Sequence, residues 1–436
     1  MNWARTEFAR PARVVSPGSV AEVVAVVQAA AGDGLTVRPV GSGHSFTGLA
    51  TTDGVLLDLS LLRRIRSVDA GTGLVEVEAG ITVHDLTELL WTHGLALQNQ
   101  GDIDKQTLAG AVSTGTHGTG AGFASLSSRV RAIELVLADG EVVRCSPSER
   151  ADLFQAAQVG LGAFGVLTAL TVECVPAFTL AVSEAPMTWA GLRAVGPGGT
   201  TRLDELVAGT DHFELFWFPH SDRVLSLSLQ RGPGDAPVAP ESALKAWWED
   251  EFMANTVLGA VLGVGAAVPR LVPPLNRVVT SVLSTRTYSD RGYRVYPHER
   301  DVVFRESEWS FPREALLPVV DELTRWFERD GRHIAFPLEV RFGAAEDAWL
   351  SPSYGRDSCY VAAHSFHKVA HESYFAAWQR IALAHGGRPH WGKLHTLDAE
   401  QLAGLYPRFA DAVRVRDEVD PNRLFANPHL TRLFGS

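Results

Sequence analysis

The sequence predicts an α+β protein with two unlike parts. Glycine and β-branched residues are dense in residues 1–175, where short strand and helix patterns alternate. Tryptophans and longer helical patterns gather in the middle of the chain. The 436 residues suffice for two or three domains at about 150 residues each. Pro176 closes a strand pattern, so we place the first boundary at this residue.

The N-terminal part has a clear local signal for each element. Ser19 and Glu22 fit a capping box at the start of a helix with an apolar stripe. Residues 37–40 predict a short strand that runs into a glycine-rich loop. Two hairpins are expected around turns at residues 70–73 and 139–140, because strand patterns flank both turns.

The later elements are read in the same way. Residues 166–175 and 358–363 predict strands, and residues 312–328 predict a long helix. Residues 230–241 are rich in proline and glycine and predict an exposed loop. The apolar run 257–268 is too short to span a bilayer, which needs about 20 apolar residues. It predicts a buried helix or loop, with a surface that rests on a membrane as the open alternative.

Composition excludes several classes of protein. The formal net charge is −11 and no basic face or tail is evident, which argues against a nucleic-acid partner. Cys145, Cys174 and Cys359 lie far apart, which argues against a disulfide scaffold or a cysteine zinc site. The histidines form no HExxH motif, so we expect no metal site. No leader pattern precedes the first helix, so we expect a cytoplasmic rather than a secreted protein, with or without a peripheral membrane contact.

Three glycine clusters invite a cofactor interpretation. Residues 160–165 spell GxGxxG, but a helix pattern precedes them and a strand follows, which reverses the order of a dinucleotide site. Residues 41–48 follow a strand, and their backbone amides could form a nest for a phosphate. Residues 113–120 are also small, polar and glycine-rich. For the last two clusters, a structural loop stays open as the alternative.

Two later segments carry charged side chains that could do chemistry. Glu339 and Arg341 are two residues apart on a predicted strand, so their side chains share one face. They fit either a polar pocket or a structural ion pair. Residues 386–393 predict an irregular loop that presents His390 and Lys393, or a plain surface loop.

Taken together, these segments resemble the aldonolactone oxidoreductases of the vanillyl-alcohol oxidase flavoprotein family, most of all the actinobacterial gulonolactone dehydrogenase-like enzymes. This group includes gulonolactone, galactonolactone and arabinonolactone oxidases and dehydrogenases, with alditol oxidase as a close relative. The resemblance runs nearly end to end. It is carried by residues 40–45, 98–101, 115–120, 215–220, 339–342, 388–393, 420–421 and 424–427.

The resemblance implies a fold and a cofactor. It implies a PCMH-type FAD-binding domain of two α/β subdomains over 1–175, a mixed α/β substrate-binding cap over 176–400, and a C-terminal segment, 401–436, that packs back on the FAD domain. It implies FAD joined covalently through the His44 imidazole. The other implied cofactor-binding residues are Val40, Gly41, Ser42, Gly43, Ser45, Gly101, Thr107, Ser113, Gly115, Thr116, His117, Gly118, Val166 and His390.

The resemblance also implies a reaction. A secondary alcohol carbon of an aldono-1,4-lactone gives hydride to flavin N5, the product is of the ascorbate type, and O2 or another acceptor reoxidises the flavin; alditol oxidation to an aldose is the alternative. Glu339, Arg341, Lys393 and His390 are the implied catalytic residues, and Thr107 and His364 are implied to join Glu339, Arg341 and Lys393 at the substrate. The general base stays open between His390 and a lysine. Glycine at position 101 accompanies oxidases among the relatives, which slightly favours O2 as the acceptor.

Overall fold

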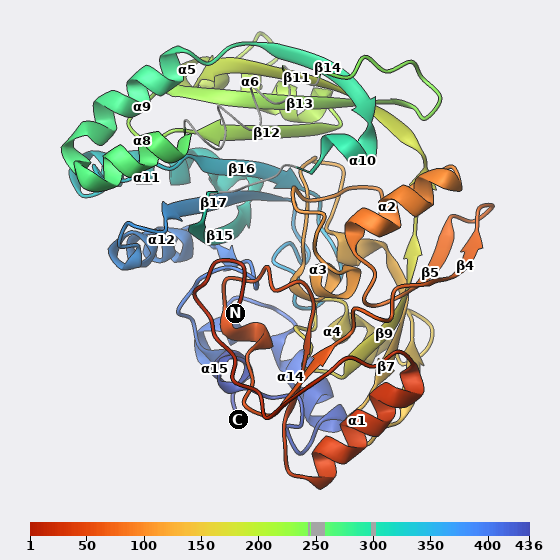
Figure 1. Cartoon of the computed structure of the whole chain (residues 1–436). Coiled ribbons are helices and arrows are strands. Elements are labelled where there is room, and N and C mark those ends of the chain that lie inside the picture. Colours follow the sequence, from red (N-terminus) through yellow and green to blue (C-terminus); the bar gives the residue numbers. More distant parts are fainter. Residues whose placement is uncertain (243–244, 246–257, 298–301) are drawn as a thin grey trace.

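The computed structural model describes residues 1–242, 245, 258–297 and 302–436 of the chain. Figure 1 shows an upper part built on one large sheet and a lower part built on smaller sheets and helices. Both chain termini lie in the lower part. This arrangement combines helices and strands in both parts, as the α+β prediction requires.

The N-terminal residues form a parallel and an antiparallel sheet. The parallel sheet has the order β1 (Arg13–Val15), β3 (Val55–Asp58), β2 (Val37–Val40). The antiparallel sheet has the order β4 (Ile65–Asp69), β5 (Leu74–Glu78), β9 (Val166–Glu173), β7 (Val130–Val136), β8 (Val142–Cys145). The β4–β5 and β7–β8 pairs confirm both predicted hairpins.

Four helices of the described residues accompany these sheets: α1 (Val20–Gly32), α2 (Val83–Thr92), α3 (Leu108–Thr114) and α4 (Ala151–Ala157). Ser19 caps α1 by accepting the amide of Glu22, as predicted. The return bond of the predicted capping box is wrong, because the Glu22 carboxylate accepts the amide of Gly18 instead, at 2.8 Å. The order of α4, residues 160–165 and β9 confirms that this glycine motif precedes a strand.

The chain enters the large sheet just after Pro176. The short strand β10 (Val175–Pro176) pairs with β6 (Leu95–Ala96) in the lower part. The order of the large sheet is β14 (Arg286–Arg291), β11 (Phe178–Thr188), β13 (Arg223–Pro233), β12 (His212–Trp217), β16 (Leu338–Gly343), β17 (Ser358–Phe366), β15 (Phe304–Pro312), β18 (Arg388–Pro389). Because β13 continues to Pro233, the loop predicted from residue 230 begins later.

Helices flank the large sheet (Figure 1). Their bounds are α5 (Trp189–Arg193), α6 (Arg202–Gly209), α8 (Leu258–Ala267), α9 (Val272–Ser281), α10 (Gly292–Val295), α11 (Leu316–Arg329) and α12 (Glu372–Ala384). The helix predicted at 312–328 is α11, preceded by a 3-10 turn at Arg313–Ala315. The apolar run forms α8, while Val257 lies outside the described residues. No helix among the described residues is long and apolar enough to cross a membrane.

The C-terminal segment returns to the N-terminal part. It holds α13 (Ala399–Ala403), α14 (Phe409–Val419) and α15 (Pro428–Phe434). Arg38 on β2 is buried and donates to the carbonyls of Leu49, Leu161, Gly162 and Phe425 at 2.8–3.0 Å. The Phe425 bond therefore fastens the end of the chain to its beginning. The domain limits at residues 175 and 400 stay predictions.

We predict that Arg38→Met lowers the free energy of unfolding by about 3–5 kcal/mol, because several buried carbonyls lose their charged donor. Urea unfolding of the FAD-loaded protein measures this change. Arg63→Met is the matched control, since Arg63 is exposed and the same substitution there should have little effect. Equal unfolding midpoints for the two variants would contradict the assigned role of Arg38.

Candidate active site

A cavity of about 610 Å³ lies where the large sheet meets the N-terminal loops. Strands β15, β16 and β17 supply one wall through Glu306, Glu308, Glu339, Arg341 and His364. The opposite wall comes from N-terminal residues, and Lys393 and His390 join it from the segment after β18. The N-terminal lining residues include His44, Ser45, Gly101, Asp102, Thr116 and His117.

Arg341 is the centre of a buried charge cluster. Its Nη2 atom is 2.6 Å from Asp102 Oδ2 and is also paired with Glu339, while Nε is 3.3 Å from Glu214 Oε1. Burial acts to lower the pKa of Arg341, but the surrounding carboxylates outweigh it and hold this pKa well above its usual value. Glu339 and Arg341 therefore form an ion pair and also line a polar pocket, so the two predicted alternatives apply together.

Glu306 links two predicted substrate residues. Its Oε2 atom is 2.5 Å from Lys393 Nζ, and its Oε1 atom is 3.8 Å from His364 Nε2. His364 Nδ1 lies 3.0 Å from the Pro337 carbonyl, which fixes the orientation of the ring. Lys393 also lies over the Phe46 ring at 5.1 Å. One carboxylate thus orients a cation and an imidazole toward the same cavity.

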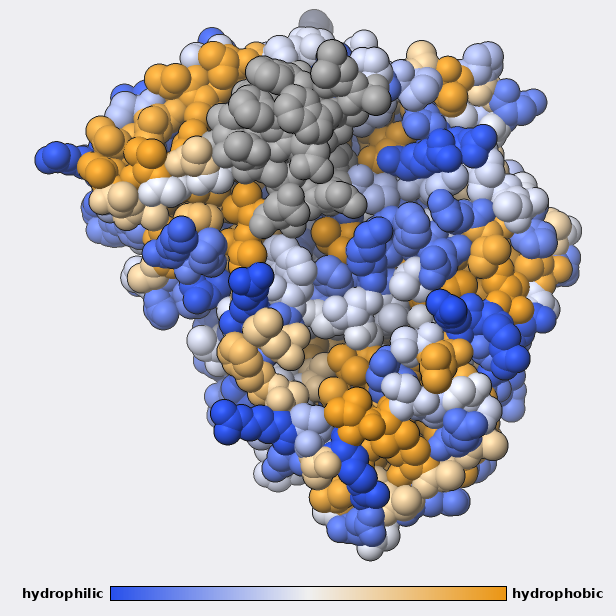
Figure 2. All heavy atoms as spheres, viewed as in Figure 1, coloured by the Kyte–Doolittle hydropathy of each residue, from blue (hydrophilic) through white to orange (hydrophobic). Residues whose placement is uncertain are grey.

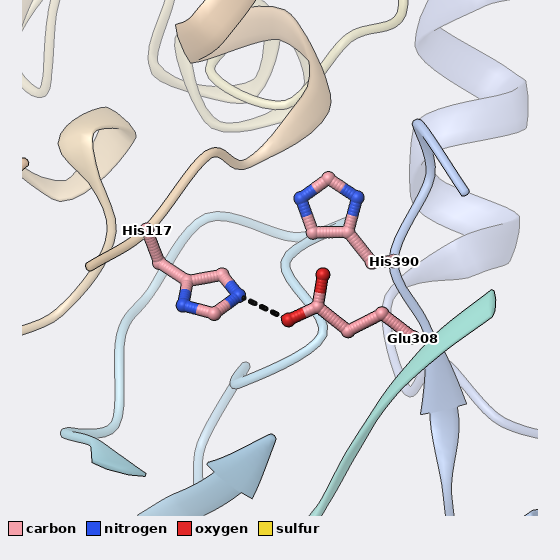
Figure 3. A group of neighbouring side chains, drawn as sticks. All are labelled: His117, Glu308 and His390. Carbon is pink, nitrogen blue, oxygen red and sulfur yellow. Dashed lines mark hydrogen bonds and ion pairs between the residues drawn. The ribbon is translucent and has the colours of Figure 1, made fainter. Parts of the chain in front are cut away.

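His117, Glu308 and His390 form a second buried group (Figure 3). His117 Nδ1 is 2.9 Å from the Gly118 carbonyl and Nε2 is 2.9 Å from Glu308 Oε1. Burial acts to raise the pKa of Glu308, but His117, His390 and Lys393 together outweigh burial, and the net shift of this pKa is downward. One ring nitrogen of each histidine and a carboxylate oxygen of Glu308 lie within 4.8 Å of one another.

His390 is a neutral hydrogen-bonding group in this arrangement. Burial lowers its pKa to about 3. Its Nδ1 atom already accepts the Gly392 amide at 3.1 Å, so the neutral ring carries its proton on Nε2. The imidazole is therefore suited to donating a hydrogen bond rather than to accepting a proton.

A second cavity, of about 180 Å³, shares His44 and Ser45 with the first and follows the glycine loop. Val40, Gly41, Ser42, Gly43, Thr107 and Ser113 line it. In the backbone bonds recorded for the described residues, the amides of residues 42–44 donate to no carbonyl. A phosphate group can accept hydrogen bonds from such amides. The second cavity therefore offers donors that fit the phosphate groups of a dinucleotide.

Some predicted residues lie away from both cavity walls. Val166 is fully buried in β9, and Gly115 ends α3 in a left-handed conformation with φ 72°. A Cβ atom on Gly118 would lie 2.1 Å from the Gln100 carbonyl, so this glycine is required by close packing. Thr107, by contrast, lines the second cavity and not the first, which favours a contact with the cofactor over a contact with the substrate.

The sequence analysis missed Asp102, Glu214, Glu306 and Glu308. A signal for the last two was present, because they alternate on the strand pattern 304–312 as Glu339 and Arg341 do on theirs. Glu214 also stands out as a carboxylate within an apolar strand. Asp102 follows the quoted segment 98–101 directly, but its pairing with Arg341 spans both parts of the molecule and has no local sign.

Two family models match the chain. A D-arabinono-1,4-lactone oxidase model covers residues 170–433, and an FAD-binding domain model covers residues 11–146. The fold is also similar to the crystal structure of cholesterol oxidase from B. sterolicum, with a TM-score of 0.82 and 17% identity over 97% of this chain and 94% of that one.

Curated relatives match over the whole length. The L-gulono-1,4-lactone dehydrogenase of Mycobacterium tuberculosis is 40% identical, covering 100% of this chain and 98% of the relative. The L-gulonolactone oxidase of Mus musculus is 34% identical over 99% and 97%. The alditol oxidase of a Streptomyces species is 32% identical over 99% and 98%. The chain therefore belongs to the aldonolactone oxidoreductases, FAD-dependent enzymes of the vanillyl-alcohol oxidase family.

Proposed function

We propose that the enzyme oxidises a secondary alcohol carbon of an aldono-1,4-lactone to an ascorbate-type product. The observation that carries this proposal is the meeting of Glu339, Arg341 and Lys393 on one cavity beside the His44 loop. A polyhydroxylated ring offers hydroxyl and carbonyl oxygens, and these side chains supply both donors and acceptors for them. FAD, when bound, takes the hydride from the alcohol carbon.

The polar side chains of the cavity have different roles in the proposed reaction. Arg341 and Lys393 donate hydrogen bonds to the substrate oxygens and balance the negative charge that develops during the reaction. Glu339 forms an ion pair with Arg341 and accepts a hydrogen bond from a hydroxyl group of the sugar. Because Nδ1 of His390 accepts the Gly392 amide, this residue donates from Nε2, and of the two candidates for the general base the lysine is the one retained. Lys393 is ion-paired with Glu306, and this pair takes up the proton that the substrate hydroxyl releases as the hydride leaves the carbon.

We expect that substrate reduces the flavin in the absence of air. Anaerobic addition of gulono-, galactono- and arabinono-1,4-lactone to the purified protein should bleach the oxidised flavin absorbance for at least one of them. Rapid return in air would support the oxidase function that Gly101 favours, and persistent bleaching would indicate another acceptor. Bleaching by alditols but by no lactone would show that the substrate is an alditol. No bleaching by either class would refute both substrate assignments.

We further propose that FAD is joined covalently to His44. This residue lines both cavities. Burial, and then the charge of Lys393, lower the pKa of His44, so its imidazole is neutral and nucleophilic at neutral pH.

The covalent link predicts that flavin stays with the polypeptide after acid precipitation. His44→Ala should release all of its flavin into the supernatant, because the bonding nitrogen is gone. His84→Ala is the control, since His84 lines the same cavity and carries no such bond in the proposal. Flavin fluorescence of the pellet after denaturing electrophoresis measures the result, and a fluorescent His44→Ala band would overturn the assignment.

A peripheral membrane contact is proposed for the surface of α8 and α9. Val264, Leu271, Val278 and Val282 are 40–65% exposed there, and Figure 2 shows apolar residues gathered at this end of the molecule. Residues 258–289 contain no Asp or Glu, although the chain as a whole is acidic. The exposed residues Arg270 and Arg277 lie in the same segment. Exposed apolar and cationic groups together match an anionic lipid surface.

Sedimentation with lipid vesicles tests whether the surface of α8 and α9 binds a membrane. The protein should sediment with vesicles of phosphatidylglycerol and phosphatidylcholine, and less with phosphatidylcholine alone, because charge attraction contributes. Val278→Asp should reduce the bound fraction, whereas Leu61→Asp, at an exposed leucine of the N-terminal part, should not. Equal binding by the two variants would refute the assigned surface.

A further inference from the structure

Glu214 is a buried carboxyl group that the proposed reaction does not use. It lies on β12, opposite Arg341 in the antiparallel register with β16. Its neighbours along the strand are Phe213 and Leu215, and its side chain is 5% exposed. A carboxylate in such a place is costly unless it is fully paired.

The pairing of Glu214 is incomplete. Arg341 directs Nη2 to Asp102 and Glu339, and turns only Nε toward Glu214, at 3.3 Å. That contact is an ion pair without hydrogen-bond geometry, since Arg341 Nε and Glu214 Oε1 both have no hydrogen-bond partner. Oxygen atoms of Glu214, Glu339 and Asp102 lie within 4.8 Å of one another. Glu214 therefore has one cation at 3.3 Å, without a hydrogen bond, and two further carboxylates within 4.8 Å.

Two carboxylates whose oxygens lie within 4.8 Å in a buried site resist ionising together. Glu339 has the direct bond to Arg341, so it keeps the negative charge. The proton is then left to Glu214. In agreement, burial raises the pKa of Glu214 well above its usual value; Arg341 opposes the shift, and Glu339 and Asp102 add to it.

We infer that Glu214 is a neutral carboxyl group that donates a hydrogen bond to Glu339 and so positions Glu339 for the substrate. This inference rests on the proposed role of Glu339. Glu214 touches neither substrate nor cofactor in this account, and it acts through Glu339. The donor fixes one oxygen of Glu339, and the remaining lone pairs are left for Arg341 and for a sugar hydroxyl.

The charged groups around Glu214 determine how it responds to pH. Arg341 and Glu339 face it from β16, and Asp102 faces it from the N-terminal part. His212, two residues earlier on the strand, donates from Nδ1 to the Thr119 carbonyl, and burial lowers its pKa to about 4, so it is neutral. Glu214 is neutral below its raised pKa and ionises as pH rises through it. Activity should therefore fall on the alkaline side.

Two variants of similar size test whether Glu214 acts as a hydrogen-bond donor or as a negative charge. Glu214→Gln keeps a neutral donor and should retain kcat/KM at neutral pH within about threefold, while Glu214→Leu should lose about 10- to 100-fold. Glu339→Gln should be as severe as the leucine variant or worse. The alkaline fall in kcat/KM should also disappear in Glu214→Gln, because glutamine does not ionise.

Infrared spectroscopy gives a readout that needs no turnover. The wild-type FAD-loaded enzyme should show a carboxylic acid carbonyl band that shifts in D2O, decreases as pH rises, and is missing in Glu214→Gln. Glu346→Gln is the matched control. Glu346 is buried, accepts from Ser125 at 2.7 Å, and burial raises its pKa, but it lies outside the cavity wall. Its variant should keep the alkaline fall and the Glu214 band.

Two results would overturn the inference. One is a loss in Glu214→Gln as large as that in Glu214→Leu, with normal flavin content in both. The other is an infrared spectrum in which Glu214→Gln removes no carboxylic acid band. If no lactone or polyol reduced the wild-type flavin, the proposed function would fail, and the infrared result would still decide whether Glu214 is neutral.

Discussion

The buried guanidinium of Arg341 joins the two parts of the molecule at the cavity. A charge removed from water is tolerated only when several partners surround it. Asp102 comes from the N-terminal part, and Glu214 and Glu339 come from neighbouring strands of the large sheet. The Asp102 bond thus ties the loop after Gly101 to the strand that presents Glu339. The relative position of the cofactor loops and the substrate side chains depends on this cluster.

The antiparallel sheet explains why so many polar groups converge. Side chains two apart share a face, and the register of neighbouring strands places those faces side by side. The pairs that meet in register are Glu214 with Arg341, Glu339 with Ala362, and Glu306 with His364. The sheet is therefore a rigid support, and the polar wall of the cavity is a property of its register.

The fold of this molecule does not by itself determine its substrate. The chain has the fold of a cholesterol oxidase at low sequence identity, which shows the architecture and leaves the substrate to the side chains. Around the cavity, carboxylates fix the cations: Glu306 holds Lys393, and three acidic residues surround Arg341. A polar wall of this kind suits a substrate rich in hydroxyl groups.

Local structure could be predicted from the sequence because its causes are local. The hairpins around residues 70–73 and 139–140 follow from turn residues between strand patterns, and the glycine loop after β2 follows from its composition. Glu339 and Arg341 were found because the period of a strand places them on one face. The resemblance then supplied the family, the cofactor and the segments that match the relatives.

The tertiary structure decided which charges meet. Asp102 and Arg341 are distant in sequence, so no spacing rule pairs them, and the same holds for Glu306 with Lys393 and for His117 with Glu308. The protonation of Glu214 and the donor role of His390 depend on burial and on hydrogen-bond partners, which exist only after the strands and loops have packed. The sequence by itself determined the family and those elements whose turns and periodicity are clear. Packing decided the electrostatics of the site, because these interactions act between groups that only the folded chain brings together.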